Sequence, residues 1–130
     1  MTLPTVNPTT ENQTQLEAAL AAAQNTIERV NALNKLAAHF RNSNIERILE
    51  LATEAATLAR HEAYTAGLVT ALRHQLHVYQ VLSDYSNALK IAYEALRLCE
   101  ELQDQTDKSI ILRTVGFIFL ELGDYPKALE

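Results

Sequence analysis

The sequence predicts an all-α fold in which antiparallel helix pairs stack one after another into a solenoid of about six to seven helices. The composition favours helices, because the 130 residues include only 3 glycines and 3 prolines while 48% of them are hydrophobic. Apolar residues recur at spacings of three and four along most of the chain, as on the buried face of an amphipathic helix. The pattern also repeats along the chain at a fixed offset, which is typical of stacked helical hairpins.

The chain divides into a short tail and one helical domain. Residues 1–12 hold Pro4 and Pro8 among threonines and asparagines and show no hydrophobic period, so we expect a flexible N-terminal tail. Residues 13–130 carry the helical pattern, and a total length of 130 residues suits a single domain.

Seven helical segments are expected in this domain. A short alanine-rich helix, Leu16–Ala23, precedes a second helix with Thr26 as its predicted N-cap; no glycine or proline separates them, so one long helix is the alternative. Asn44 is the predicted N-cap of the third helix. Gly123 is expected to stop the sixth helix, and Pro126 suits the first turn of a seventh. The ranges expected after the first helix are 27–40, 45–59, 64–82, 85–102 and 107–122, with the last helix starting at 124.

The strongest sequence signal is an internal repeat. Residues 82–89 (LSDYSNAL) align with residues 122–129 (LGDYPKAL), 40 positions later, and five of the eight positions are identical. The same offset pairs Leu72 with Leu112 and Tyr79 with Phe119. A shared period predicts a solenoid, because one helical hairpin cannot bury its apolar face without a stacked neighbour.

One segment carries a family resemblance. Residues 123–130 resemble the turn between the two helices of a tetratricopeptide repeat (TPR) and the start of its second helix. Upstream of this segment, Leu112, Val115, Gly116 and Phe119 match the large, large, small and aromatic positions of the first TPR helix.

The resemblance implies a TPR-like right-handed solenoid. Its repeats would span approximately 27–62, 64–103 and 107–130, with the last one truncated. The 40-residue period is longer than the usual TPR length of about 34 residues. It is similar to the elongated TPRs of kinesin light chains, of cell-polarity adaptors and of bacterial peptide-sensing regulators.

The resemblance also implies which residues face a partner, because the first helix of each TPR lines a concave groove. The expected peptide-binding residues are Arg73, His77, Gln80, Arg113, Phe117, Glu121 and Phe40, with Leu33 and Ala37 beside Phe40. Arg73 and Arg113 occupy equivalent repeat positions, where two guanidinium groups would bind a carboxylate of an extended partner. Pairing of these arginines with acids of the solenoid itself, such as Glu121, is the alternative. Phe40 and Phe117 are the expected apolar anchors.

Catalytic and metal sites are not expected. His74 and His77 lie three positions apart, but no third metal ligand is evident, so two half-buried histidines are the preferred interpretation. Cys99 lies in a stretch rich in alanine and leucine and is predicted to be a packed thiol rather than a reactive one. We find no combination of nucleophile and base and no glycine-rich phosphate loop, so we expect neither enzymatic activity nor a cofactor.

Charge and hydropathy limit the partners and the compartment. The net charge is −5, and basic residues are interleaved with acids, so nucleic acid is not an expected partner. The sequence shows neither a signal peptide nor a long apolar segment, so we expect a cytoplasmic protein that does not enter a membrane.

Two functions follow from these expectations. The first is a protein- or peptide-binding scaffold or adaptor that uses the concave face of a TPR array. The alternative is an N-terminal regulatory or oligomerisation segment of a larger bacterial signalling protein, such as a nucleotide cyclase, a histidine kinase or a peptide-sensing regulator. Because the helix expected at 124 is cut at Glu130, we expect a longer parent chain or a second copy to cover Phe117, Ile118 and Leu120.

Overall fold

The computed structural model describes residues 12–123 of the chain. The predicted flexible tail over residues 1–12 lies outside the described residues, apart from Asn12. The helix predicted to begin at Asp124 lies outside them as well.

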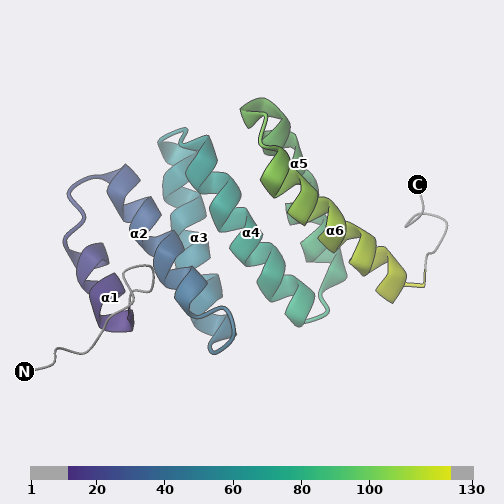
Figure 1. The fold of residues 1–130 in the computed structure, drawn as a ribbon, viewed down its shortest axis with the longest axis horizontal. Coiled ribbons are helices and arrows are strands. Elements are labelled where there is room, and N and C mark those ends of the chain that lie inside the picture. The colour runs from purple at the N-terminus through teal and green to yellow at the C-terminus, as the bar shows by residue number, and fades with distance from the viewer. Residues whose placement is uncertain (1–11, 124–130) are drawn as a thin grey trace, which may run out of the picture.

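The predicted all-α class is confirmed. Residues 12–123 form six helices: α1 (Gln13–Ala21), α2 (Thr26–His39), α3 (Ile45–His61), α4 (Thr65–Val81), α5 (Tyr85–Leu102) and α6 (Gln105–Glu121). Each helix packs on the next one in chain order, and α2 also contacts α4. Figure 1 shows the six helices side by side, from α1 at one end of the row to α6 at the other. Within residues 12–123 none of these helices combines the length and apolar character needed to cross a membrane.

Asparagine and aspartate begin most of the helices. In five of the six described helices, the N-cap side chain accepts a hydrogen bond from the backbone N–H three residues further on, which pairs a donor that the helix itself leaves free. These N-caps are Asn12, Asn25, Asn44, Asp84 and Asp104. A single polar side chain therefore marks the start of these five helices, whereas Tyr64, the N-cap of α4, makes no such bond.

Three predicted helix starts differ from the structure. Helix α1 begins at Gln13, three residues before the predicted start at Leu16, because Asn12 caps it. Thr26 is the first residue of α2, not its N-cap, because Asn25 takes the capping position and accepts from the N–H of Glu28. Residues 22–25 separate α1 from α2, so the alternative of one long helix is wrong. Helix α6 begins at Gln105, two residues before the predicted start, because Asp104 caps it.

The ends of α3, α4, α5 and α6 repeat one backbone conformation every 20 residues. One or two residues after each of these helices ends, a residue has a left-handed φ, between 53° and 74°. These residues are Ala63, Ser83, Gln103 and Gly123. In the first of these turns the N–H of Tyr64 donates to the carbonyl of Ala59 at 2.8 Å, and the equivalent bond recurs in the next two turns. The 40-residue sequence repeat is therefore a pair of 20-residue helix units.

Small residues allow the helices to pack closely. Alanines with no exposed surface line the buried faces of α3 and α5: Ala52, Ala55, Ala59, Ala88, Ala92 and Ala95. Between α2 and α4 the small residue is Gly67, where a Cβ atom would lie 2.6 Å from the ring of Tyr64 and 2.7 Å from Cγ1 of Val30. The close contact of α2 with α4 therefore depends on this glycine.

Candidate functional site

Three hollows lie in a row on the face formed by α1, α2, α4 and α6. Their volumes are about 390 Å³ between α1 and α2, about 510 Å³ between α2 and α4, and about 50 Å³ between α4 and α6. Asn31 and Lys35 line both of the first two hollows, and Arg73 lines both of the last two. The hollows are therefore neighbours on one face, and we call them together the groove. It lies on the side nearer the viewer in Figure 1, where α2, α4 and α6 lie in front of α3 and α5.

Three of the predicted site residues come together in this groove. Arg73, His77 and Gln80, which are spaced four and three residues apart on α4, all line the α4–α6 hollow. The α6 residues that line the same hollow are Ile110, Ile111 and Thr114. The residues predicted on α6 are Arg113, Phe117 and Glu121, which are exposed to solvent and line none of the hollows described.

The residues predicted from the first repeat belong to the core. Leu33 and Ala37 have no exposed surface, and Phe40 is only 8% exposed. The ring of Phe40 packs edge-on against the ring of His39, with centroids 5.2 Å apart. These three side chains therefore leave almost no surface for a partner, because the apolar stripe of α2 that carries them packs against the neighbouring helices.

Arg73 is paired within the chain. Its Nη1 donates to Oδ1 of Asp107 at 2.8 Å, which links α4 to the first turn of α6. Burial raises the pKa of Asp107 above its usual range, and the neighbouring Asp104 raises it further, while Arg73 opposes the shift. Of the two predicted outcomes for Arg73, internal pairing is the one observed in the free chain. Arg113 makes no ion pair with any residue between 12 and 123.

The two histidines of α4 face the groove as neutral side chains. Burial, together with the positive charges of Arg73 and Arg41, lowers the pKa of His74 to about 4. His77 has its Nε2 atom 3.2 Å from the carbonyl oxygen of Arg41, and burial lowers its pKa as well. In the described part of the chain, no three His, Cys, Asp or Glu side chains are grouped as metal ligands would be.

Asn34 is a groove residue that the sequence analysis did not select. It is the buried polar residue of the core, 6% exposed, and its Nδ2 donates to the carbonyl of Gly67 at 3.1 Å. Its Oδ1 is buried and has no hydrogen-bond partner among the described residues. The sequence did contain a signal for Asn34: it follows Leu33 directly within the apolar stripe of α2 and interrupts this stripe with an amide.

Two further groove residues are cations that the sequence analysis also passed over. Lys35 is exposed on α2 and lines the first two hollows, and Arg41, just after α2, lines the third. With Arg73, whose charge the ion pair with Asp107 offsets, they give the groove three basic side chains, whereas Glu28 is the one carboxylate among the lining residues described. A chain with a net charge of −5 thus has a locally basic groove.

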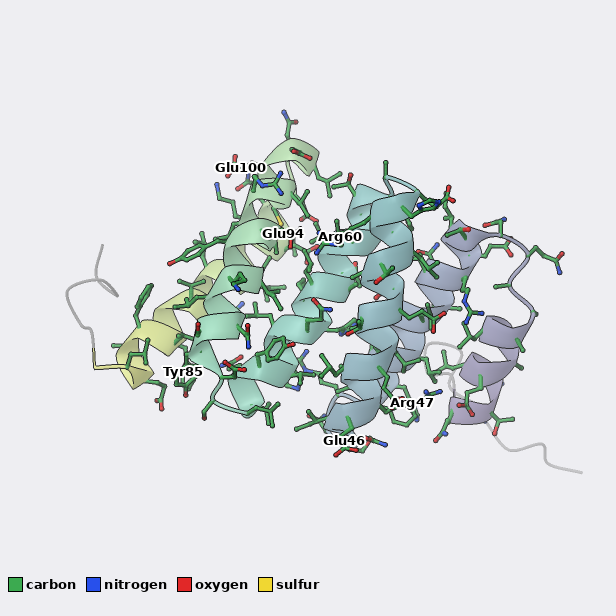
Figure 2. The ribbon with its side chains drawn as sticks, turned by 180° about the vertical axis from the view of Figure 1, so that it is seen from behind. Glu46, Arg47, Arg60, Tyr85, Glu94 and Glu100 are labelled. Atoms are coloured by element: carbon green, nitrogen blue, oxygen red, sulfur yellow. The ribbon has the colours of Figure 1, made fainter. Side chains whose placement is uncertain are left out.

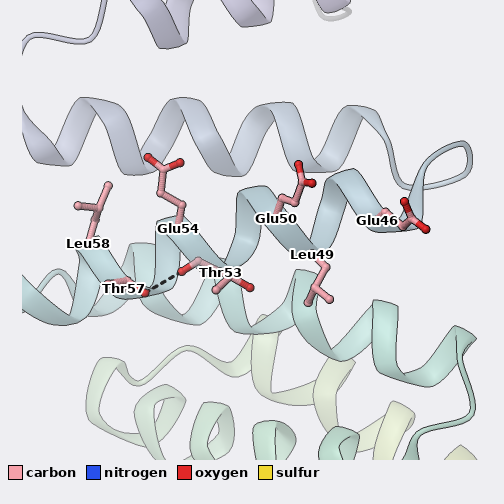
Figure 3. Close-up of a pocket in the computed structure, with 7 residues that line it drawn as sticks. All are labelled: Glu46, Leu49, Glu50, Thr53, Glu54, Thr57 and Leu58. Atoms are coloured by element: carbon pink, nitrogen blue, oxygen red, sulfur yellow. Dashed lines mark hydrogen bonds between the residues drawn. The ribbon is translucent and has the colours of Figure 1, made fainter.

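A larger hollow of about 810 Å³ lies on α3, on the opposite face, but its walls offer little to a ligand. All seven of its lining residues belong to that one helix, as Figure 3 shows. Two of its three glutamates already have partners: Glu54 pairs with Arg29 at 2.6 Å and Glu50 with Arg47 at 3.3 Å. On this same face Arg60 of α3 meets Glu94 of α5 (Figure 2), so ion pairs here join neighbouring helices.

Cys99 is packed as predicted. The thiol is free and buried near the end of α5, and burial raises its pKa, which disfavours the reactive thiolate.

Comparison with protein-family models, curated proteins and solved structures gives no match for this chain. The groove and the repeat pattern of the sequence are therefore the features that bear on function.

Proposed function

We propose that this chain is a protein- or peptide-binding module whose groove takes an extended, acidic segment of a partner. The observation that carries the proposal is the charge of the groove. Lys35 and Arg41 line it without an ion pair among the described residues, beside Arg73, whose charge Asp107 offsets, in a molecule whose overall charge is −5. Complementary charge steers a partner to a surface and fixes its orientation there.

The shape of the groove supports an extended ligand. The three hollows are neighbours along the face of α1, α2, α4 and α6, so an extended ligand would contact more than one of them. The resemblance of the repeats to TPRs, whose concave face binds peptides, points to the same class of ligand. Amide and hydroxyl groups of Asn31, Thr70 and Gln80 add hydrogen-bonding capacity along the path.

A direct titration tests this proposal. The probe is a fluorescent, acetylated and amidated peptide of three Glu-Ala units, and its counterpart has three Lys-Ala units. We expect the acidic peptide to bind, the basic one not to bind, and the affinity to fall as the salt concentration rises. No difference between the two peptides would contradict the proposal.

Variants locate the site of binding. Lys35→Glu/Arg41→Glu is expected to weaken binding of the acidic peptide about tenfold, since each exposed pair contributes roughly 0.2–1 kcal/mol and reversal adds repulsion. Lys90→Glu/Arg97→Glu on α5 changes the net charge equally but lies outside the groove, and it is expected to have little effect. An equal loss of affinity for the acidic peptide in the two variants would show that the net charge of the protein, and not the groove, determines binding.

The second candidate function is assembly through α6. Leu112, Phe117 and Leu120 are 48%, 46% and 47% exposed, which is unusual for large apolar side chains on one helix. Ile118, predicted to share this surface, is instead fully buried. If α6 joins copies of the chain or a neighbouring domain, Phe117→Glu/Leu120→Glu is expected to reduce the apparent mass in analytical ultracentrifugation. A wild-type chain that is monomeric at high concentration would remove self-association from consideration.

A further inference from the structure

Arg73 lies at the narrowest part of the groove. The α4–α6 hollow, at about 50 Å³, is far smaller than the other two hollows, at about 510 Å³ and 390 Å³, and Arg73 lines it on the α4 side. The guanidinium of Arg73 reaches across to α6 and donates to the carboxylate of Asp107 at 2.8 Å. The ion pair therefore joins the two helices that flank the narrow end of the groove.

This ion pair is not part of a closely packed interface. Helix α6 packs on α5, and α2 packs on α4, but α4 and α6 do not pack closely on one another. The side chains of Arg73 and Asp107 are 32% and 17% exposed, so the pair remains accessible from the groove. A carboxylate that enters the groove can therefore reach Arg73, where it meets the negative charge of Asp107 as well as the positive charge of the guanidinium.

The surroundings of Asp107 make it a weak partner for Arg73. Burial raises the pKa of Asp107, and the neighbouring Asp104 raises it further, so the charged form of Asp107 is disfavoured. Asp104 itself is the N-cap of α6 and accepts from the backbone N–H of Asp107 at 3.0 Å. Because the partner of Arg73 is disfavoured in its charged form, another carboxylate can take its place.

We propose that the Arg73–Asp107 ion pair is an autoinhibitory contact, in which Asp107 holds the guanidinium that a carboxylate of the acidic ligand would otherwise bind. The proposal rests on the peptide-binding function and adds an internal competitor to it. A ligand held by Lys35 and Arg41 contacts Arg73 only by displacing Asp107. The wild-type chain therefore binds an acidic segment more weakly than its three basic groove residues would allow.

A double-mutant cycle on Arg73 and Asp107 tests this assignment, with the labelled three-unit Glu-Ala peptide as the probe. Asp107→Asn keeps the size of the side chain, and it is expected to bind the peptide about fivefold more tightly than the wild type does. Arg73→Gln alone is expected to change the affinity less than about twofold, because Asp107 already occupies Arg73. In the Asp107→Asn background, Arg73→Gln is expected to remove the whole gain.

Two further variants serve as controls. Glu121→Gln also removes one negative charge from α6, but Glu121 lines none of the hollows described, so the affinity is expected to stay within about twofold of the wild type. Asp107→Ser is expected to reproduce the gain of Asp107→Asn. Circular dichroism establishes that each variant is folded.

The outcomes separate this inference from the function on which it rests. If the wild type binds the peptide and Lys35→Glu/Arg41→Glu weakens binding, but neither Asp107 variant binds more tightly, the autoinhibitory contact is wrong and the binding function stands. An equal gain in Glu121→Gln, or a gain in Asp107→Asn that persists after Arg73→Gln, would also overturn the contact. If the peptide binds neither the wild type nor the Asp107 variants, both proposals fail.

Discussion

The left-handed residue after α3 provides the sharpest test of the fold. Ala63 has φ 53°, a conformation that costs a residue with a Cβ atom about 1–2 kcal/mol relative to its preferred regions. Glycine removes this cost but loses roughly 0.5–1 kcal/mol more conformational entropy on folding. Ala63→Gly is therefore expected to raise the free energy of unfolding by about 0.5–1 kcal/mol.

Urea denaturation followed by circular dichroism measures this gain. A change of about 1 kcal/mol corresponds to a rise of roughly 4 °C in the melting temperature of a domain of this size. The matched control is Ala38→Gly, since Ala38 is exposed inside α2 and the substitution is expected to destabilise by about 0.5–1 kcal/mol. The reverse change, Gly123→Ala at φ 74°, is expected to destabilise as well. If Ala63→Gly destabilises as much as Ala38→Gly does, residue 63 is helical, and the left-handed turn that recurs every 20 residues is wrong at this position.

Two further predictions concern packing and pH. Gly67→Ala is expected to destabilise by about 1–3 kcal/mol, because its Cβ would lie 2.6 Å from the Tyr64 ring and 2.7 Å from Cγ1 of Val30 on α2. An unchanged urea midpoint would contradict the close contact of α2 with α4. His74 has a folded pKa of about 4 against an ordinary value of 6.5, so the unfolded chain binds the proton first. The contribution of neutral His74 to the free energy of unfolding is fully present above pH 6.5. It falls by roughly 2–3 kcal/mol as the pH falls towards 4. Urea midpoints measured between pH 6.5 and pH 4 are expected to depend less on pH in His74→Gln than in the wild type. The same pH dependence in both proteins would show that carboxylates alone cause the loss of stability.

The elements of the fold followed from local signals, while their exact starts did not. Helix spacing and capping residues were sufficient to place α3 and α5, because Asn44 and Asp84 are the capping residues next to their first turns. Before α2 and α6, two residues able to cap stand close together, and the local sequence does not decide between them. The left-handed turn at Ala63 had no signal, because alanine gives no hint of a positive φ.

The candidate site followed from the sequence only where a single helix positions it. Arg73, His77 and Gln80 share a face of α4, so their helical spacing brought them together correctly. Equivalent repeat positions do not guarantee equal surroundings: Arg73 is paired with Asp107, whereas Arg113 is exposed. The unused acceptor of Asn34 depends on how α4 packs against α2, which local patterns do not encode.

The central claim is that the basic groove binds an acidic, extended segment, and one titration tests it most directly. The wild-type chain, Lys35→Glu/Arg41→Glu and the matched control Lys90→Glu/Arg97→Glu are each titrated into the labelled Glu-Ala peptide, with circular dichroism to establish that all three are folded. We expect the wild type and the control to bind and the groove variant to bind about tenfold more weakly. Absence of binding by the folded wild type, or equal affinity in all three proteins, would contradict it.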